Sequence, residues 1–249
     1  MDTFNLLLLI WTFIALFVMI LLLKIPAPYG RYASRSWGPI LNNRLSWLLM
    51  EAPSLVIPLY FLKFICPGNL NFAVLLLILL WVVHYFYRSL IFPFLLRHKR
   101  NMPLSVVLMG ASFNVINSLF NMYYLTKRAS FHPSWVRDPR FIFGLMVFVA
   151  GFLSHFESDR ILRGLRSKSE GDYQIPKGWL FEYVSCPNYF GEILEWTGWA
   201  IASWSLAGLS FAIWTFANLA PRALSYHRWY KENFEDYPEN RRALIPYLI

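Results

Sequence analysis

Charged residues are scarce in this sequence, and their scarcity excludes an ordinary soluble protein. Only 15% of the 249 residues are Asp, Glu, Lys or Arg, whereas 57% are hydrophobic and 19% are aromatic. Soluble globular domains carry about 25% charged residues. Long apolar segments separated by short polar ones are typical of polytopic membrane proteins, so we predict an all-α integral membrane protein.

Cysteine is also scarce, with only two residues, and the common nucleotide-binding motifs are missing. Cys66 and Cys186 match no metal or redox spacing and say nothing about the compartment. Neither G-x-G-x-x-G nor G-x-x-x-x-G-K-[ST] occurs, which excludes the usual Rossmann and P-loop sites. No Ser-His-Asp or Cys-His arrangement stands out. The one group of possible metal ligands, His155-Phe156-Glu157-Ser158-Asp159, is better explained as a hydrated helix end, and we predict no metal.

Seven apolar segments account for most of the chain. The first contains no charged residue, and the only charged residue before it is the acidic Asp2. The positive N-terminal region of a signal peptide is therefore missing, so we expect a retained helix rather than a cleaved signal peptide. A tight joint near Ser205 separates the last two segments, and a polar, aromatic tail follows them, which we expect to begin as a helix and end as a loop. We expect a single domain over residues 1–249. The predicted spans are 4–23, 45–65, 72–96, 104–125, 141–153, 193–204 and 206–219.

The basic residues predict the orientation of the chain. Seven spans place its two ends on opposite sides of the membrane. Most of the 23 Lys and Arg residues fall in loops on the side of the C-terminus, which the positive-inside rule therefore makes cytosolic. The net charge of +9 is thus mainly a topology signal and does not support nucleic-acid binding.

Glu51 and Tyr85 are the polar residues within the spans that point most clearly to chemistry. A carboxyl in an apolar span costs about 2.5–3.5 kcal/mol, so Glu51 needs a structural partner, such as Arg88 or an amide, or a role in catalysis. Tyr85 and Arg88 lie three residues apart on one helical face. A phenol and a buried carboxyl together can polarise a substrate carbonyl. Both readings of Glu51 remain open at this point.

Prolines and asparagines indicate inward-facing surfaces on the second and fourth spans. Pro53 and Pro58 free backbone carbonyls, which a membrane tolerates only where a helix faces protein or water. Offsets of three and seven residues place three amides on one stripe, which should face the interior. These residues are Asn114, Asn117 and Asn121.

We predict that the C-terminal part, 158–249, binds the cofactor. Within it, the stretch 158–199 contains most of the side chains that could hold a charged ligand. Asn188 and Glu192 lie four residues apart at a predicted helix start. Without a glycine-rich loop, arginines would have to bind phosphates through charge-assisted, bidentate bonds. Orientation and contact with lipid headgroups are the alternative explanation of these charges. The candidates are Arg163, Arg166, Arg222 and Arg228, with Lys99 and Arg100 in a neighbouring loop.

Six segments together resemble the membrane-bound steroid 5α-reductases, in the family's order and with similar spacing. The resemblance covers nearly the whole chain, although related sterol reductases and membrane methyltransferases share the C-terminal pattern. One difference precedes Ser158-Asp159, where His155-Phe156-Glu157 replaces the family's N-x-H. The segments are MEAPSLVIP (50–58), HYFYRS (84–89), SDRILRGLR (158–166), YQIPKGWLFEYVS (173–185), NYFGEILEW (188–196) and FEDYPENRRALIP (234–246).

The resemblance implies NADPH-dependent reduction of a 3-oxo-Δ4-steroid inside a bundle of seven helices. Glu51 and Tyr85 would hydrogen-bond the 3-oxo group, hydride would pass to C5, and the enolate would be protonated at C4. Trp47 and Phe211 would contact the steroid. The implied cofactor ligands are Arg100, Asp159, Arg166, Tyr173, Asn188, Glu192, Arg222 and Tyr230.

Three other functions remain open from the sequence. An S-adenosylmethionine-dependent membrane methyltransferase could use the same C-terminal region, and a reductase could act on another lipid enone, such as an enoyl thioester. A non-catalytic lipid-binding or transport protein could line a pathway with the same polar residues. In the favoured interpretation the protein is a monomer among membrane lipids, and its lipophilic substrate enters from the bilayer. The membrane is the bacterial cytoplasmic membrane or the endoplasmic reticulum.

Overall fold

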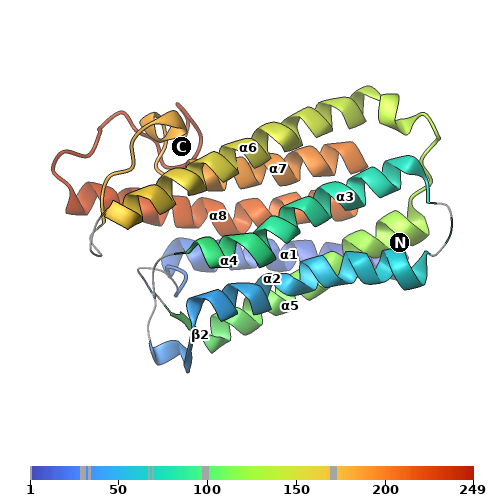
Figure 1. The fold of residues 1–249 in the computed structure, drawn as a ribbon, viewed down its shortest axis with the longest axis horizontal. Coiled ribbons are helices and arrows are strands. Elements are labelled where there is room, and N and C mark those ends of the chain that lie inside the picture. The colour runs from blue at the N-terminus through green and yellow to red at the C-terminus, as the bar shows by residue number, and fades with distance from the viewer. Residues whose placement is uncertain are drawn as a thin grey trace. The chain divides into compact units, whose positions relative to one another are not determined.

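The computed structural model describes residues 2–28, 32, 35–66, 68, 70–96, 101–168 and 173–249, without the side chains of 166–168. These residues form mainly helices (Figure 1). The helices are α1 (Thr3–Lys24), α2 (Asn43–Tyr60), α3 (Phe72–Phe86), α4 (Phe92–Leu95), α5 (Leu104–Tyr123), α6 (Pro139–Lys168), α7 (Pro187–Ser203) and α8 (Leu206–Asn233).

Shorter elements extend or connect these helices. π-Helical turns continue α2, α3 and α5, at Phe61–Ile65, Tyr87–Ile91 and Tyr124–Arg128 respectively. Strands β1 (Ile40–Leu41) and β2 (Met102–Pro103) pair antiparallel, with Ile40 opposite Pro103. The remaining short elements are 3₁₀ turns at Arg35–Trp37, Trp135–Arg137 and Trp179–Glu182.

Among the described residues, five helical segments are long and apolar enough to cross a membrane. This confirms the prediction of an all-α polytopic protein, and the first four spans begin and end close to the predicted residues. The crossing of the membrane by α7 and α8, and the cytosolic side of the C-terminus, stay predictions. The five segments are Thr3–Lys24, Asn43–Ile65, Phe72–Leu95, Leu104–Arg128 and Pro139–Leu165.

The predicted end of the fifth span near Leu153 is wrong, because α6 continues to Lys168. Its later turns are polar, yet they remain helical. Arg160 donates two hydrogen bonds, at 2.6 and 2.8 Å, to the Glu157 carboxylate one turn earlier. Such pairs support a helix without any apolar residue, so a hydropathy window ends before the helix does.

The helices that contain the last two predicted spans are longer than the spans. α7 begins at Pro187, which confirms the helix start predicted at Asn188, and proline is favoured in the first helical turn. α8 continues beyond residue 219 to Asn233, which confirms that the tail begins as a helix. The tight joint is confirmed: Trp204 adopts a left-handed conformation with φ 43°, and the Ser205 side chain caps α8 by accepting from Gly208 N at 2.9 Å.

By its backbone contacts the chain divides into two compact units. Unit 1 comprises Met1–Pro26 and Phe143–Ile249, and unit 2 comprises Ala27–Ile142. Unit 1 therefore contains α1, most of α6, α7 and α8, and unit 2 contains α2 to α5. Whether the two act as a single membrane domain stays a prediction.

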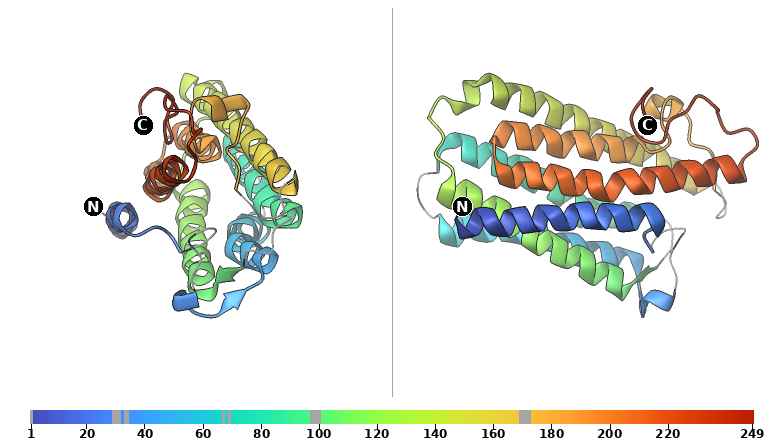
Figure 2. Two further views of the ribbon diagram at one scale, coloured as in Figure 1. Left: turned by 90° about the vertical axis from the view of Figure 1, so that its left-hand side faces the viewer. Right: turned by 180° about the vertical axis from the view of Figure 1, so that it is seen from behind.

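In unit 1, four glycines let α6 and α7 meet backbone to backbone. A Cβ atom on Gly151 would stand 2.3 Å from Glu195 N, and one on Gly198 would stand 2.3 Å from Phe148 N. No side chain fits there unless a helix moves, and close approach at small residues is a common way to pack membrane helices. Figures 1 and 2 show α6, α7 and α8 side by side. The glycines are Gly144, Gly151, Gly191 and Gly198.

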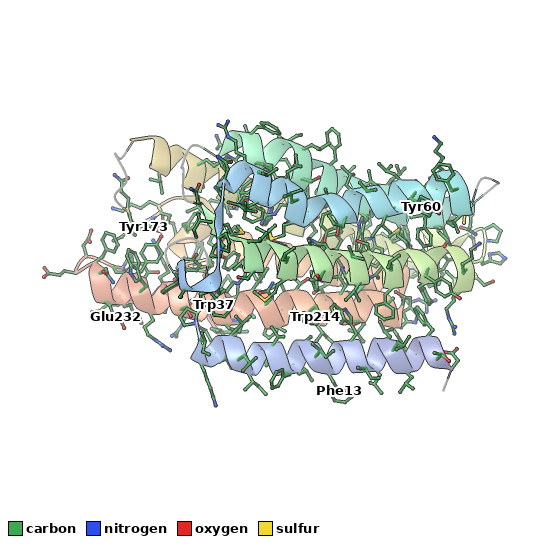
Figure 3. The ribbon with its side chains drawn as sticks, turned by 90° about the horizontal axis from the view of Figure 1, so that it is seen from below. Phe13, Trp37, Tyr60, Tyr173, Trp214 and Glu232 are labelled. Carbon is green, nitrogen blue, oxygen red and sulfur yellow. The ribbon has the colours of Figure 1, made fainter. Side chains whose placement is uncertain are left out.

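Helix α1 packs along α8 within the same unit (Figure 2). The indole N–H of Trp214 donates to the Trp11 carbonyl at 3.0 Å, and the Thr12 and Ser210 hydroxyls lie 2.7 Å apart. Figure 3 shows Trp214 on α8 and Phe13 on α1. Phe13 is 61% exposed, as an apolar side chain that faces lipid would be.

In unit 2, α2 packs against both α3 and α5. Pro58 has no N–H with which to bind the carbonyl of Ser54 one turn earlier, and the buried Trp81 indole of α3 donates to that carbonyl at 2.8 Å. This confirms that α2 turns a proline-freed carbonyl toward protein. The predicted inward stripe on α5 is also confirmed, because its asparagines are all buried: Asn114, Asn117 and Asn121.

Candidate functional site

Glu51 is buried on α2 in unit 2, with 8% of its surface exposed. The Asn114 side chain on α5 donates from Nδ2 to Glu51 Oε2 at 3.2 Å. Arg88 Nε lies 3.9 Å from the other carboxyl oxygen, Oε1. The carboxyl therefore has a neutral donor on one oxygen and a cation beside the other. Both structural partners considered for Glu51 from the sequence, Arg88 and an amide, are present.

Arg88 is held between aromatic rings. Its guanidinium carbon lies 4.5 Å from the centroid of the Trp47 ring and 4.5 Å from that of Phe92. These two rings meet edge to face at 5.3 Å. Cation–π contacts of this kind stabilise a charge away from water. Trp47, predicted to contact the steroid, thus lies beside the cation that accompanies Glu51.

Tyr85 is buried on α3, with 4% of its surface exposed. Its ring packs against Trp81 at 5.3 Å and against His84 at 4.9 Å, measured between ring centroids. Tyr85 precedes Arg88 by one helical turn, and α3 packs against α2. Glu51 and Tyr85 are therefore both buried in unit 2 on neighbouring helices. Their convergence on one substrate oxygen stays a prediction.

A second polar cluster lies in unit 1, where α6 and α7 meet. Asn188 Nδ2 donates to Asp159 Oδ1 at 3.3 Å. His155 joins the two helices, because its Nδ1 lies 3.2 Å from the Asn188 carbonyl and 3.6 Å from Glu192 Oε2, while its Nε2 lies 3.5 Å from Asp159 Oδ2. The structure thus brings together three predicted cofactor ligands, Asp159, Asn188 and Glu192.

The interpretation of residues 155–159 as a hydrated helix end is wrong. His155 is 1% exposed and Asp159 is 5% exposed, because the glycine contact with α7 covers this face of α6. The four-residue spacing of His155 and Asp159 was the available signal for a shared buried face. Among the described residues, no three His, Cys, Asp or Glu side chains are grouped so that they could hold a metal ion.

Aromatic side chains surround the two predicted cofactor-binding tyrosines. Tyr173 packs edge to face on Trp229, with ring centroids 4.9 Å apart. Tyr230 is buried and stacks on Tyr237 at 5.4 Å with an angle of 6° between the rings. Ile175 belongs to the same buried cluster. Both tyrosines therefore lie in one aromatic region of unit 1.

A hydroxyl connects this region to the C-terminal tail. Ser185 Oγ lies 2.6 Å from His227 Nδ1 and 2.5 Å from the Tyr237 hydroxyl, and it donates to the Arg242 carbonyl at 3.0 Å. Burial, followed by the charges of Lys231, Arg241 and Arg242, lowers the pKa of His227 to about 4. Burial is also the main reason that the pKa of Tyr237 is raised. His227 is therefore neutral at neutral pH.

The other predicted ligands are distributed as follows. Phe211 is buried in unit 1, with its ring 4.3 Å from that of Trp196. Arg222 is partly buried on α8, whereas Arg228 is exposed. Arg100 and Lys99 lie outside the described residues, and of Arg166 only the backbone, in α6, is described. The roles of all these residues stay predictions.

Comparison with known proteins gives a consistent family match. Residues 100–249 match the family described as 3-oxo-5-alpha-steroid 4-dehydrogenase. The bovine protein 3-oxo-5-alpha-steroid 4-dehydrogenase 1 is 43% identical over 92% of this chain and 91% of its own length. The human protein of that name is 42% identical over 89% of this chain and 86% of its own length. The Arabidopsis thaliana protein steroid 5-alpha-reductase DET2 is 37% identical over 92% and 90%.

Proposed function

We propose, from the premise that this chain belongs to the 3-oxo-5-alpha-steroid 4-dehydrogenase family, that it reduces the Δ4 double bond of 3-oxo-Δ4-steroids with NADPH. The family match and the apolar helices make the chain a multi-pass integral membrane oxidoreductase. The observation that carries the proposed chemistry is the buried carboxyl of Glu51, between the Asn114 amide and Arg88.

The protein residues would act on the carbonyl end of the enone. Hydrogen bonds from Glu51 and Tyr85 to the 3-oxo oxygen would withdraw electrons from the conjugated double bond and make C5 electrophilic. They would also stabilise the enolate oxygen that forms when C5 accepts a hydride, and a proton then completes the reaction at C4. Donors aimed at a developing oxyanion in a dry site are among the strongest contributions to catalysis. Burial of both side chains supports such a site.

The residues of unit 1 fit a nicotinamide dinucleotide. The amide of Asn188 and the carboxylates of Asp159 and Glu192 offer donors and acceptors suited to a carboxamide, and Arg222 offers a cation suited to a phosphate. When bound, NADPH supplies the hydride. His155 would keep the two carboxylates apart on α6 and α7. The substrate, being lipophilic, would enter from the bilayer.

The test uses the purified full-length protein in detergent with NADPH. Testosterone, progesterone and an enoyl thioester are offered separately, nicotinamide absorbance is followed, and the products are identified by mass spectrometry. The proposal predicts NADPH oxidation with the steroid enones and 5α-reduced products. Binding of S-adenosylmethionine without NADPH oxidation would instead support the methyltransferase alternative, and neither activity would support a lipid-binding or transport role.

A further inference from the structure

A chain of hydrogen bonds in unit 2 leads from Ser118 to Glu51, and each side chain donates to the next. Ser118 Oγ on α5 donates to Ser54 Oγ on α2 at 3.0 Å, and Ser54 Oγ donates to Asn114 Oδ1 at 3.0 Å. Asn114 Nδ2 then donates to two acceptors, the Met50 carbonyl at 2.7 Å and Glu51 Oε2 at 3.2 Å. Both N–H donors of this buried amide are thereby used, and its oxygen accepts one hydrogen bond.

The orientation of the Asn114 amide is determined by its surroundings. The Met50 carbonyl is only an acceptor, so the amide must turn its NH₂ group toward it. The reverse orientation would place Oδ1 against that carbonyl and leave two buried oxygens facing each other. A Cβ atom on Gly110 would lie 2.4 Å from Met50 Cγ, so the glycine one turn before Asn114 keeps the helices close enough for this bond.

This orientation assigns different roles to the two oxygens of Glu51. Oε2 accepts the Asn114 N–H, whereas Oε1 lies 3.9 Å from Arg88 Nε. Without the bond from Asn114 the carboxyl could turn about its last torsion, which is broad and two-fold. A fixed orientation of the carboxyl is what a group that hydrogen-bonds a substrate carbonyl requires.

We propose that Asn114 is a positioning residue that fixes the orientation of the Glu51 carboxyl in which this group meets the substrate. The inference rests on the proposed function, in which Glu51 hydrogen-bonds the 3-oxo group. Asn114 itself does not act on the substrate, and its effect on the reaction passes through Glu51. Asn114→Leu keeps a similar volume and removes the amide, and it lowers kcat about tenfold to a hundredfold, the size expected for losing a bond to a buried carboxyl.

Asn117 provides a matched control on the same helix. It is buried to the same degree one turn further along, and its Nδ2 has no hydrogen-bond partner among the described residues. Asn117→Leu therefore removes an equally buried amide that is not bonded to Glu51, and kcat stays near the wild-type value.

The test is a double-mutant cycle on kcat with NADPH and testosterone, combined with thermal unfolding of each variant in detergent. If Asn114 acts through Glu51, Asn114→Leu lowers kcat in the wild-type background but changes it less than twofold in the Glu51→Gln background. Equal losses in both backgrounds, or equal losses from Asn114→Leu and Asn117→Leu, would overturn the inference while leaving the proposed function intact. Absence of turnover in the wild type would overturn both.

Discussion

Substitution of Gly151 by alanine tests the backbone contact on which the polar cluster of unit 1 depends. The new Cβ would lie 2.3 Å from Glu195 N and 2.6 Å from the Gly191 carbonyl oxygen. Ordinary contacts between carbon atoms are about 3.5–4.0 Å long, so α6 and α7 would have to separate by about 1 Å. Backbone atoms cannot rotate out of the way as a flexible side chain can.

The expected loss of stability follows from two opposing effects. Overpacking costs about 1–3 kcal/mol. The higher helix propensity of alanine relative to glycine offsets up to about 1 kcal/mol of this loss. We therefore expect a net loss of roughly 1–2 kcal/mol. A separation of this size would also carry His155 Nδ1, now 3.2 Å from the Asn188 carbonyl, out of hydrogen-bonding range and weaken NADPH binding.

Thermal unfolding in detergent and NADPH titration measure the two effects. Gly164→Ala is the matched control on the same helix, because a Cβ there would meet nothing within 4 Å. That variant should be as stable as the wild type or more stable, by up to about 1 kcal/mol. If the Gly151→Ala variant were as stable as the wild type and bound NADPH equally well, the argument from close helix contact would be refuted.

Three further predictions concern single contacts. Because the pKa of His227 is lowered to about 4 from an ordinary value of 6.5, its contribution to stability is present above pH 6.5 and is lost as the pH falls toward 4. His227→Gln should flatten the pH dependence of denaturant unfolding in this window by about 1–2 kcal/mol, after allowance for partial solvent screening. Trp81→Phe leaves the Ser54 carbonyl without the indole donor at 2.8 Å and should lower the free energy of unfolding by about 1–3 kcal/mol. His155→Ala should raise the Kd of NADPH about tenfold and leave the KM of the steroid unchanged, whereas Arg160→Ala, on the exposed side of α6, should change neither.

Much of the helical architecture follows from local sequence. Long apolar segments with few charged residues specify helices whatever they pack against, and this is why α1, α2, α3 and α5 begin and end near the predicted residues. The asparagine stripe of α5 was predicted to be buried from spacing alone, because amides are costly in lipid. The partner of the Ser54 carbonyl was not predictable, since it comes from Trp81 on another helix.

Features that depend on contact between distant segments were missed. The burial of His155 results from the approach of α7. The spacing of His155 and Asp159 places them on one face of α6, but it does not show which segment covers that face. A signal was nevertheless present, because Gly144 and Gly151 are seven residues apart, as are Gly191 and Gly198. Matched spacings of small residues in two apolar segments indicate close helix packing. The pairing of Asn114 with Glu51 likewise depends on how α2 and α5 align.

The central claim is that Glu51 and Tyr85 together polarise the carbonyl of a steroid enone. The most direct measurement is kcat for 5α-reduction by Glu51→Gln and Tyr85→Phe in protein whose thermal unfolding matches the wild type, with NADPH carrying deuterium at its transferable position. The account predicts deuterium at C5 of the product and a kcat at least a hundredfold lower in each variant, as expected when a donor to an oxyanion is lost. Near-normal kcat in both variants would contradict it.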